Sequence, residues 1–384
     1  MQNFSFHNPC QIEFGAGQIS KLSALIPSDA RVLLLYGGGS IKHNGVYDEV
    51  VAALSQHHWQ AFAGVEPNPE YETLMRAVEF AREQNLDFIL AVGGGSVIDG
   101  AKFVAAAVPH DGDCWLIIGN RVPIKTALPI GVVLTLPATG SESNFAAVIS
   151  RRETNDKLSF KNAKVFPQFA ILDPKSTMSL PARQIGNGVV DAFVHTTEQY
   201  LTYPCEALLQ DRFAEGILQT LIEIGAQTLA EPNDYNARAN LMWAANQALY
   251  GMVGLGQAQD WATHAMGHEL TMLHGLDHAQ TLAIILPALW RYRFESKKAK
   301  LAQYGRRVWQ LSGEDEQVAR QAIEKTADFF NAMGLSTRLS AYQIDAKIAA
   351  DGVAAQLTRH GRVKLGEHFD LTPEDCRAIL LTAH

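Results

Sequence analysis

The chain has 384 residues, a length that suggests two or three domains, and 47% of the residues are hydrophobic. This composition excludes a disordered or low-complexity protein and provides enough apolar side chains for a large core. The 32 Lys and Arg residues are outnumbered by 40 Asp and Glu residues, so the net charge is −8. No dense basic patch is present, which argues against nucleic acid or an anionic membrane as a partner.

The cysteines and the apolar runs indicate a reducing compartment and no membrane span. The four cysteines form no CxxC pair and no regular framework, which is typical of free thiols: Cys10, Cys114, Cys205 and Cys376. Residues 1–9 lack the basic flank and apolar stretch of a signal peptide. No apolar run reaches the roughly 18 residues that a membrane helix needs. We therefore expect a cytoplasmic protein.

The first half of the chain alternates short apolar runs with amphipathic segments. Three apolar runs predict buried strands, at Arg31–Tyr36, Asp87–Val92 and Gly131–Leu136. Helical spacing predicts a helix between the first two, from Tyr71, Leu74, Val78 and Ala81. Apolar runs without alternation indicate a parallel sheet that is covered on both faces. Right-handed crossovers then place the loops that follow the strands at one edge of the sheet.

The second half is dominated by long helical patterns. We expect helices at 184–202, 205–230, 236–254, 258–274, 281–293, 297–311 and 315–333. Thr372-Pro373 adds a further helix start, with a capping hydroxyl and a proline at the first helical position. The sequence therefore predicts an α/β domain with a mostly parallel sheet over residues 1–178, followed by an all-helical domain over residues 179–384.

Two glycine loops give the first chemical signal. Residues 37–40 and 93–96 both read GGGS, and each follows a predicted buried strand. Neither loop matches GxGxxG or a P-loop, and each by itself is compatible with a simple tight turn. Two such loops in adjacent βα units favour phosphate binding, because glycine backbones and helix N-termini present N–H groups to anions. We therefore predict that the first domain binds a dinucleotide.

The first glycine loop also bears on which dinucleotide binds. In many NAD sites an acid near the end of a strand accepts hydrogen bonds from the adenosine ribose hydroxyls. This loop offers no carboxylate and presents Gly38, Gly39 and Ser40, with Lys42 and His43 just beyond. A 2′-phosphate is tolerated there, whereas an acid would repel it. The loop therefore favours NADP(H) over NAD, provided that it faces the ribose.

A third polar segment follows the strand at 131–136. Residues 135–144 read TLPATGSESN and are dense in hydroxyl groups. The crossover argument places this segment at the same sheet edge as the glycine loops. A polar turn with a capping serine remains the alternative.

The helical half carries side chains at the spacing of metal ligands. Asp191 and His195 lie four residues apart, which places both on one face of a helix. Four histidines then fall within fifteen residues: His264, His268, His274 and His278. Carboxylate and imidazole ligands suit zinc or ferrous iron. A salt bridge for the first pair and structural roles for the other histidines remain open.

Taken together, these motifs make the chain similar to a known family. It resembles the iron-containing, or group III, alcohol dehydrogenases over essentially its whole length, and most of all their branch of NADPH-dependent aldehyde reductases and butanol dehydrogenases. The segments that carry the resemblance are 36–40, 66–69, 93–99, 135–144, 187–195, 264–268 and His278. Many motifs in the same order make this resemblance specific.

The resemblance implies a site for each part of the reaction. It implies a divalent metal, Fe²⁺ or Zn²⁺, held by four ligands: Asp191, His195, His264 and His278. It implies His268 and Asp99 as catalytic residues, with His268 an unligated histidine that relays a proton. It implies contacts to the cofactor from Gly38, Gly39, Ser40, Asn68, Gly94, Gly95, Ser96, Asp99, Thr135, Thr139, Ser141, Asn144 and Lys157. No ligand role follows for His274.

Two departures from the family pattern fall on the cofactor side. Many members carry an Asp in the first glycine loop, which favours NAD, and this chain lacks it. Members usually have two threonines where this chain has Thr135-Leu136, so one hydroxyl contact is lost. Neither departure touches the implied metal ligands.

The resemblance implies a metal-dependent alcohol dehydrogenase or aldehyde reductase. Such an enzyme transfers a hydride between NADP(H) and short-chain aldehydes or alcohols. It also implies a homodimer, with an edge strand near Gln11–Phe14 as a candidate contact. One alternative is a metal-dependent lyase or cyclase similar to dehydroquinate synthase, which would need Lys and Arg around the metal; these are scarce near Asp191 and His264. The other is a non-catalytic nucleotide-binding protein.

Overall fold

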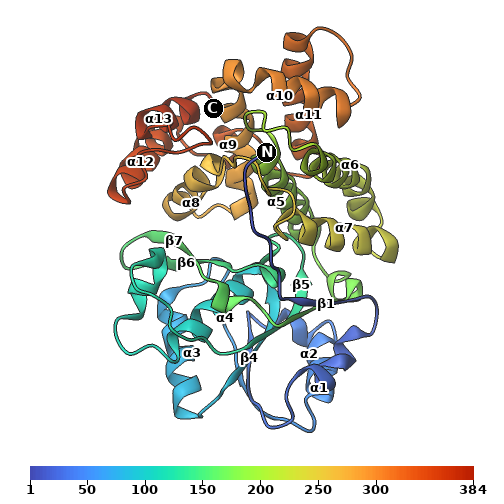
Figure 1. Cartoon of the computed structure of the whole chain (residues 1–384), viewed down its shortest axis with the longest axis vertical. Helices are drawn as coiled ribbons and strands as arrows, with labels where there is room; N and C mark the ends of the chain where they lie inside the picture. Colours follow the sequence, from blue (N-terminus) through green and yellow to red (C-terminus); the bar gives the residue numbers. More distant parts are fainter. The chain divides into compact units, whose positions relative to one another are not determined.

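The computed structural model describes all residues, Met1–His384, and divides them into two compact units. The sheet unit comprises His7–Leu180 and Pro232–Asn246. The helical unit comprises Met1–Phe6, Pro181–Glu231 and Gln247–His384. Figure 1 shows the strands gathered in the sheet unit and the long helices α5 to α13 in the second half of the chain.

The sheet unit is built on six parallel strands. Their order across the sheet is β1-β8-β5-β4-β2-β3, and every neighbouring pair is parallel. The strands are β1 Gln11–Phe14, β2 Arg31–Tyr36, β3 His58–Phe62, β4 Phe88–Gly94, β5 Ile130–Leu136 and β8 Phe169–Leu172. The three strands predicted from apolar runs are β2, β4 and β5, which lie side by side. The predicted α/β class is confirmed.

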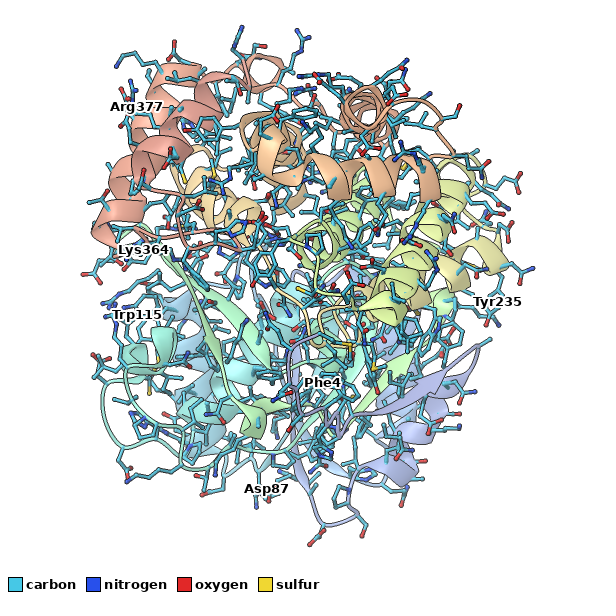
Figure 2. The ribbon with its side chains drawn as sticks, turned by 45° about the horizontal axis from the view of Figure 1, so that its top comes forward. Phe4, Asp87, Trp115, Tyr235, Lys364 and Arg377 are labelled. Atoms are coloured by element: carbon cyan, nitrogen blue, oxygen red, sulfur yellow. The ribbon has the colours of Figure 1, made fainter.

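Helices cover both faces of this sheet, as the unbroken apolar strands require. Alternate side chains of β2 point to opposite faces: Leu33 and Leu35 join the core under α3 and α4, whereas Leu34 joins the core under α1 and α2. These helices are α1 Leu22–Leu25, α2 Val46–Ala53, α3 Tyr71–Glu83 and α4 Gly95–Ala107. Asp87, labelled in Figure 2, precedes β4 and accepts a hydrogen bond from Arg31 N–H at 2.7 Å. It marks the amino-terminal edge of the sheet, opposite the glycine loops.

A separate antiparallel hairpin, β6 Ala146–Arg151 and β7 Asp156–Lys161, follows the third polar segment. The sequence did not predict this hairpin, nor strands β3 and β8. The hairpin carries charged residues at Arg151, Asp156 and Lys157, and β3 has no fully buried residue, so neither shows the apolar run of a central strand.

The helical unit contains the predicted long helices. They are α5 Ala182–Tyr200, α6 Leu208–Ala230, α8 Ala262–His274, α9 His278–Tyr292, α10 Phe294–Arg307 and α11 Asp315–Ala332, followed by α12 Ala346–Arg359 and α13 Pro373–Leu381. α13 begins as predicted, with a capping box between Thr372 and Asp375. α12 was not predicted. No helix has the length and apolarity that crossing a membrane requires.

Several predicted helix ends differ from the structure by three residues or more, and two of these differences have a backbone reason. α7 Tyr235–Ala248 stops six residues before the predicted end at 254, ahead of Gly251, whose φ is 109°. α8 begins at Ala262 rather than at 258, because Trp261 takes a left-handed conformation with a φ of 60°. A bulky residue rarely adopts this conformation, and it breaks the helical path before the metal-ligand segment.

The two units differ from the predicted division after residue 178 in two segments of the chain. Most of α7 belongs to the sheet unit: Met242 lies in its core, and Asn246 donates hydrogen bonds at 2.8 Å to both Glu142 and Ser143. The first six residues belong to the helical unit, where Gln2 N–H donates to Gly256 at 2.7 Å. Such exchanges depend on long-range contacts that local patterns do not encode.

Candidate functional site

Three of the predicted cofactor segments follow adjacent strands at the carboxyl edge of the sheet. The first loop turns at Gly39, whose φ is 98°, and leads into a short helical turn at Ser40–Lys42. The second runs from β4 directly into α4, so Gly94 and Gly95 form the N-terminus of a thirteen-residue helix. This geometry directs the unpaired N–H groups of the helix toward the sheet edge, which suits a phosphate.

Close approach explains why Gly95 cannot carry a side chain. A Cβ atom there would lie 2.5 Å from the Thr139 Oγ1 atom. The second loop and the third polar segment are therefore in contact, with Thr139 also accepting the Ser141 N–H at 3.2 Å. Thr135, near the end of β5, is 8% exposed.

A polar cluster joins three predicted cofactor residues from distant parts of the chain. Lys157 Nζ on β7 donates to Asn68 Oδ1 at 2.7 Å, and Asn68 N–H donates to Ser96 Oγ at 3.2 Å. Asn68 has a left-handed backbone with a φ of 58°, a conformation that asparagine tolerates better than most residues. The structure thus places an amide, a hydroxyl and a cation at the start of α4.

Asp99, Ser141 and Asn144 are brought together around a residue that the sequence analysis missed, Lys102. Ser141 Oγ donates to Asp99 Oδ1 at 2.5 Å, and Val148 N–H donates to Asp99 Oδ2 at 2.9 Å. Lys102 Nζ donates to Ser141 Oγ at 2.8 Å and to Asn144 Oδ1 at 3.0 Å. These polar atoms are therefore engaged in holding the third polar segment against α4.

Burial changes the pKa of both charged members of this cluster. Burial lowers the pKa of Lys102 to about 8, although Asp99 and Glu142 act to raise it. Burial likewise raises the pKa of Asp99, against the opposing effects of Lys102 and Ser141. The one signal for Lys102 in the sequence is its position three residues after Asp99 on α4, on the same helix face.

In the helical unit, the carboxylate of Asp191 lies at the centre of three imidazoles. Asp191 Oδ1 lies 3.5 Å from His195 Nδ1, 3.9 Å from His264 Nε2 and 3.9 Å from His278 Nε2. Ligand atoms of Asp191, His195 and His264 all lie within 4.8 Å of one another. Helices α5, α8 and α9 supply these side chains, so the structure brings together all four residues that the resemblance implied as ligands.

The distances and the hydrogen bonding fit a metal ion. Two ligand atoms of a tetrahedral site with bonds of about 2.0–2.1 Å lie about 3.3–3.4 Å apart, close to the separations observed here. Asp191 Oδ1 and His264 Nε2 are buried and have no hydrogen-bond partner. Buried polar atoms are rarely left in this state, so a cation between them accounts for both. Although burial acts in the other direction, the imidazoles hold the pKa of Asp191 well below its usual range.

A second buried carboxylate, which the sequence analysis did not identify, supports His264. Glu198 Oε2 makes a short contact with His264 Nδ1, and Glu198 Oε1 accepts the Thr263 N–H at 2.8 Å. Burial acts to lower the pKa of His264, but Glu198 and Asp191 together raise it to about 9. The available signal was spacing, since Glu198 follows His195 by three residues and Asp191 by seven on the same face of α5.

The two remaining histidines of the motif differ in position. His268 is 8% exposed, and its ring centroid lies 5.2 Å from that of His278 and 6.3 Å from that of His264. It therefore borders the cluster one helical turn after a candidate ligand. His274 is the last residue of α8, and burial lowers its pKa.

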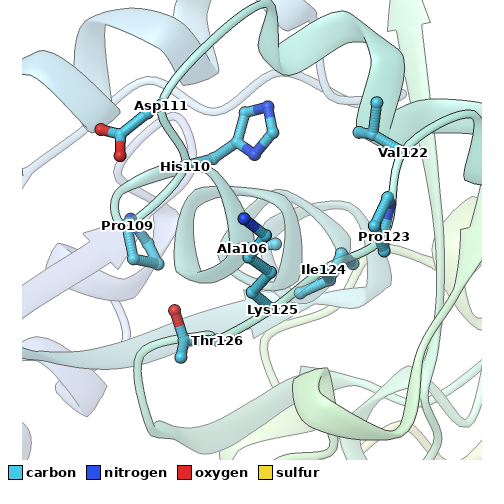
Figure 3. Close-up of a pocket in the computed structure, with 9 residues that line it drawn as sticks. All are labelled: Ala106, Pro109, His110, Asp111, Val122, Pro123, Ile124, Lys125 and Thr126. Atoms are coloured by element: carbon cyan, nitrogen blue, oxygen red, sulfur yellow. The ribbon is translucent and has the colours of Figure 1, made fainter.

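A pocket in the sheet unit lies away from the glycine loops of the same unit. It is lined in part by His110, Asp111 and Lys125, beyond the C-terminal end of α4 (Figure 3). α4 has thirteen residues, so about 20 Å separates its two ends. This pocket therefore does not belong to the glycine-loop edge.

Comparisons with known proteins agree with these motifs. The family model of the iron-containing alcohol dehydrogenases matches residues 9–174, and the model of the C-terminal part of that family matches residues 186–384. The NADPH-dependent aldehyde reductase YqhD of Escherichia coli is 55% identical over 384 residues, covering 99% of both chains. The NADH-dependent butanol dehydrogenase A of Clostridium acetobutylicum is 38% identical over 385 residues, with 99% of both chains covered.

Solved structures give the same result. The crystal structure of E. coli YqhD matches with a TM-score of 0.98 and 54% identity, covering 100% of this chain and 99% of that one. The NADH-dependent butanol dehydrogenase A of Thermotoga maritima matches with a TM-score of 0.96 and 36% identity, with coverage of 100% and 99%. With both halves of its sequence matched, the chain belongs to the iron-containing alcohol dehydrogenase family.

Proposed function

We propose that this protein is a metal-dependent aldehyde reductase and alcohol dehydrogenase that transfers a hydride between NADP(H) and short-chain aldehydes or alcohols. The observation that carries the proposal is the buried Asp191 oxygen surrounded by three imidazoles. A carboxylate and neutral imidazoles are ligands that Zn²⁺ and Fe²⁺ both accept. We propose Asp191, His195, His264 and His278 as the metal ligands, with Fe²⁺ or Zn²⁺ as the ion.

The protein residues bind and orient the groups that react. When bound, the metal supplies a Lewis acid and NADP(H) supplies or accepts the hydride. The glycine loops offer backbone N–H groups to the phosphates of the cofactor. We propose that the cofactor is bound by Gly38, Gly39, Ser40, Asn68, Gly94, Gly95, Ser96, Asp99, Thr135, Thr139, Ser141, Asn144 and Lys157.

His268 is the proposed catalytic residue for proton transfer. It borders the ligand cluster and lies four residues after His264 on α8, which is the position of a group that can exchange a proton with the substrate oxygen. Asp99 is proposed to support catalysis from the cofactor side. Its two oxygens accept hydrogen bonds from Ser141 and Val148, which favours a role in holding the third polar segment.

The preference for NADP(H) is proposed from the first glycine loop. Relatives in this family are named both for NADPH and for NADH, so membership alone does not decide the cofactor. Gly38 has open space around the position of a Cβ atom, and the loop offers no carboxylate. Lys42 adds a cation, with its ammonium 5.4 Å from the centre of the Tyr36 ring.

No observation favours the lyase or cyclase alternative. An anionic substrate would need cations near the metal, yet α8 carries no Lys or Arg and α5 carries only Arg183. The side chain of Arg183 is 67% exposed. We further propose that the enzyme acts in the cytoplasm, as its free cysteines suggest, and that it forms a homodimer in which edge strand β1 is a candidate contact.

Metal analysis combined with a cofactor comparison tests the proposal. We expect purified protein to contain about one divalent ion per chain and to oxidise NADPH with butyraldehyde at least about tenfold faster than NADH. A chelator should abolish the reaction, and added metal should restore it. A protein that binds metal and NADPH without reducing any aldehyde would instead be a non-catalytic binding protein.

A further inference from the structure

Glu198 contacts both the candidate ligand His264 and the first turn of α8, the helix that carries His264. It lies on α5 and is 2% exposed, so its carboxylate is removed from solvent. Asp191 and His195 precede it by seven and three residues, and all three side chains share one helix face. A buried carboxylate is costly unless its oxygens accept strong hydrogen bonds.

Three hydrogen bonds link Glu198 to the turn that begins α8. Its Oε2 atom accepts from His264 Nδ1, its Oε1 atom accepts from Thr263 N–H at 2.8 Å, and its backbone oxygen accepts from Asp260 N–H at 2.9 Å. The same turn contains Trp261 in its left-handed conformation. Glu198 therefore holds the start of α8 at three separate points, on both sides of Trp261.

The contact with His264 also decides which ring nitrogen faces the ligand cluster. Imidazole carries one proton when neutral, and a carboxylate at Nδ1 keeps that proton on Nδ1. The lone pair is then on Nε2, the atom that lies 3.9 Å from Asp191 Oδ1. A carboxylate behind a ligand histidine fixes its tautomer and orientation in this way in many metal sites.

The negative charges of Asp191 and Glu198 also favour a divalent ion at this cluster. Asp191 and Glu198 supply two negative charges, and neither pairs with a Lys or Arg in the structure's ion pairs. A divalent ion with three neutral imidazoles would bring the cluster to neutrality. Buried charges are tolerated when they are balanced in this way.

We infer that Glu198 is a positioning residue that prepares His264 for metal binding by holding its Nδ1 proton and anchoring the first turn of α8. This inference rests on the metal site of the proposed function. It adds that metal affinity depends on a residue that does not touch the metal.

Replacement of Glu198 by Gln tests the tautomer directly. The single amide oxygen of Gln must serve the Thr263 N–H, because a backbone donor cannot change its role. The amide NH₂ group then faces His264 Nδ1, which must accept, so the ring proton moves to Nε2 and blocks the ligand atom. We expect Glu198→Gln to bind Zn²⁺ about 10- to 100-fold more weakly in competition with a chromophoric chelator.

A matched control separates this effect from loss of stability. Glu215 is also a buried carboxylate in the helical unit, where it accepts from Tyr200 at 2.9 Å and pairs with Arg307 at 2.9 Å. It contacts none of the candidate ligands in the structure's hydrogen bonds. We expect Glu215→Gln to lower the thermal midpoint of the metal-free protein while leaving the Zn²⁺ dissociation constant within about threefold of that of the unmodified protein.

The unmodified protein provides a second test that does not depend on the folding of a variant. Histidine-labelled protein loaded with Zn²⁺ should show the His264 proton on Nδ1 by NMR, with the signal assigned by its loss in His264→Gln. A proton on Nε2, or equal Zn²⁺ affinity in Glu198→Gln and the unmodified protein, would overturn the inference while leaving the metal site intact. Failure of the unmodified protein to bind any divalent ion would overturn the metal site and the inference together.

Discussion

His264 and His268 lie four residues apart on α8, and their surroundings differ. His264 Nε2 faces Asp191 Oδ1 and has no hydrogen-bond partner, as a ligand atom would. The ring of His268 lies 6.3 Å from that of His264 and borders the cluster from one turn away. We therefore expect substitutions at the two positions to affect metal and turnover differently.

We predict that His264→Ala loses both bound metal and turnover, whereas His268→Ala keeps its metal and loses turnover. Deleting a ligand removes a metal bond, while deleting a proton-transfer group typically lowers the rate by about 10²–10⁴-fold. Elemental analysis and NADPH oxidation with butyraldehyde measure the two effects separately. Equal metal content in the two variants would contradict this division of roles.

The raised pKa of His264 predicts how metal affinity varies with pH. The pKa of about 9 lies above the ordinary value of 6.5, so His264 is protonated in the metal-free protein at neutral pH. This protonation stabilises the metal-free fold fully below about pH 6.5, and the stabilisation is lost as the pH rises through about 9. A metal must displace the proton, so its apparent affinity should rise with pH.

We expect the apparent Zn²⁺ affinity to increase by about tenfold per pH unit between pH 6.5 and 8.5, measured by chelator competition with the chelator's own protonation corrected. The direction is the informative part, because an unperturbed imidazole would already be deprotonated over most of this range. An affinity that stays flat above pH 7 would show that His264 titrates normally.

Among the elements of the sheet unit, the loops that follow β2, β4 and β5 carry most of the candidate cofactor residues, whereas the strands position these loops. Sequence reasoning located these strands and their shared edge, because buried apolar runs and right-handed crossovers are strong local constraints. It missed the hairpin β6–β7, even though this hairpin supplies Lys157 to the cluster with Asn68 and Ser96. The residue was carried over from the family, but its structural context came only from the fold.

The first glycine loop carries a prediction about cofactor choice. Gly38 can accept a side chain, since no atom lies within 4 Å of a Cβ atom placed there, whereas Gly39 has a φ of 98° that disfavours one. We expect Gly38→Asp to weaken NADPH binding about 10- to 100-fold more than NADH binding, because the new carboxylate would repel a 2′-phosphate.

Gly38→Asn is the matched control, because it has nearly the same shape without the charge. Dissociation constants for both cofactors, measured by fluorescence titration, distinguish charge from bulk. If Gly38→Asp and Gly38→Asn weaken NADPH binding equally, or if the preference for NADPH over NADH does not change, the charge of the loop does not determine 2′-phosphate binding.

For the molecule as a whole, metal binding connects three helices of one unit. The candidate ligands come from α5, α8 and α9, so an ion bound there links Asp191 to His278, which lies 87 residues further along the chain. A ligand that binds only the folded state stabilises it in proportion to the logarithm of its concentration over its dissociation constant.

We predict that free Zn²⁺ at about 100 times its dissociation constant stabilises the helical unit by about 2.7 kcal/mol, which corresponds to roughly 5–10 °C in its thermal midpoint. Calorimetry of the protein with and without a chelator measures the shift. Asp191→Asn should lose most of it, since this variant removes the charged ligand at the centre of the cluster. A full shift in Asp191→Asn would show that Zn²⁺ acts elsewhere.

Local patterns were enough to establish the fold class and the family, and the family resemblance then named Asp191, His195, His264 and His278 as candidate ligands. Parallel strands, long helices and the i,i+4 spacing of Asp191 and His195 are short-range patterns, and the comparisons confirm the family that these motifs indicated. Three features became visible only in the folded chain: Glu198 supports His264, Lys102 organises Asp99 and Ser141, and α7 packs with the sheet unit. These features depend on contacts between distant segments, and no local pattern records which distant partner a buried polar side chain will meet.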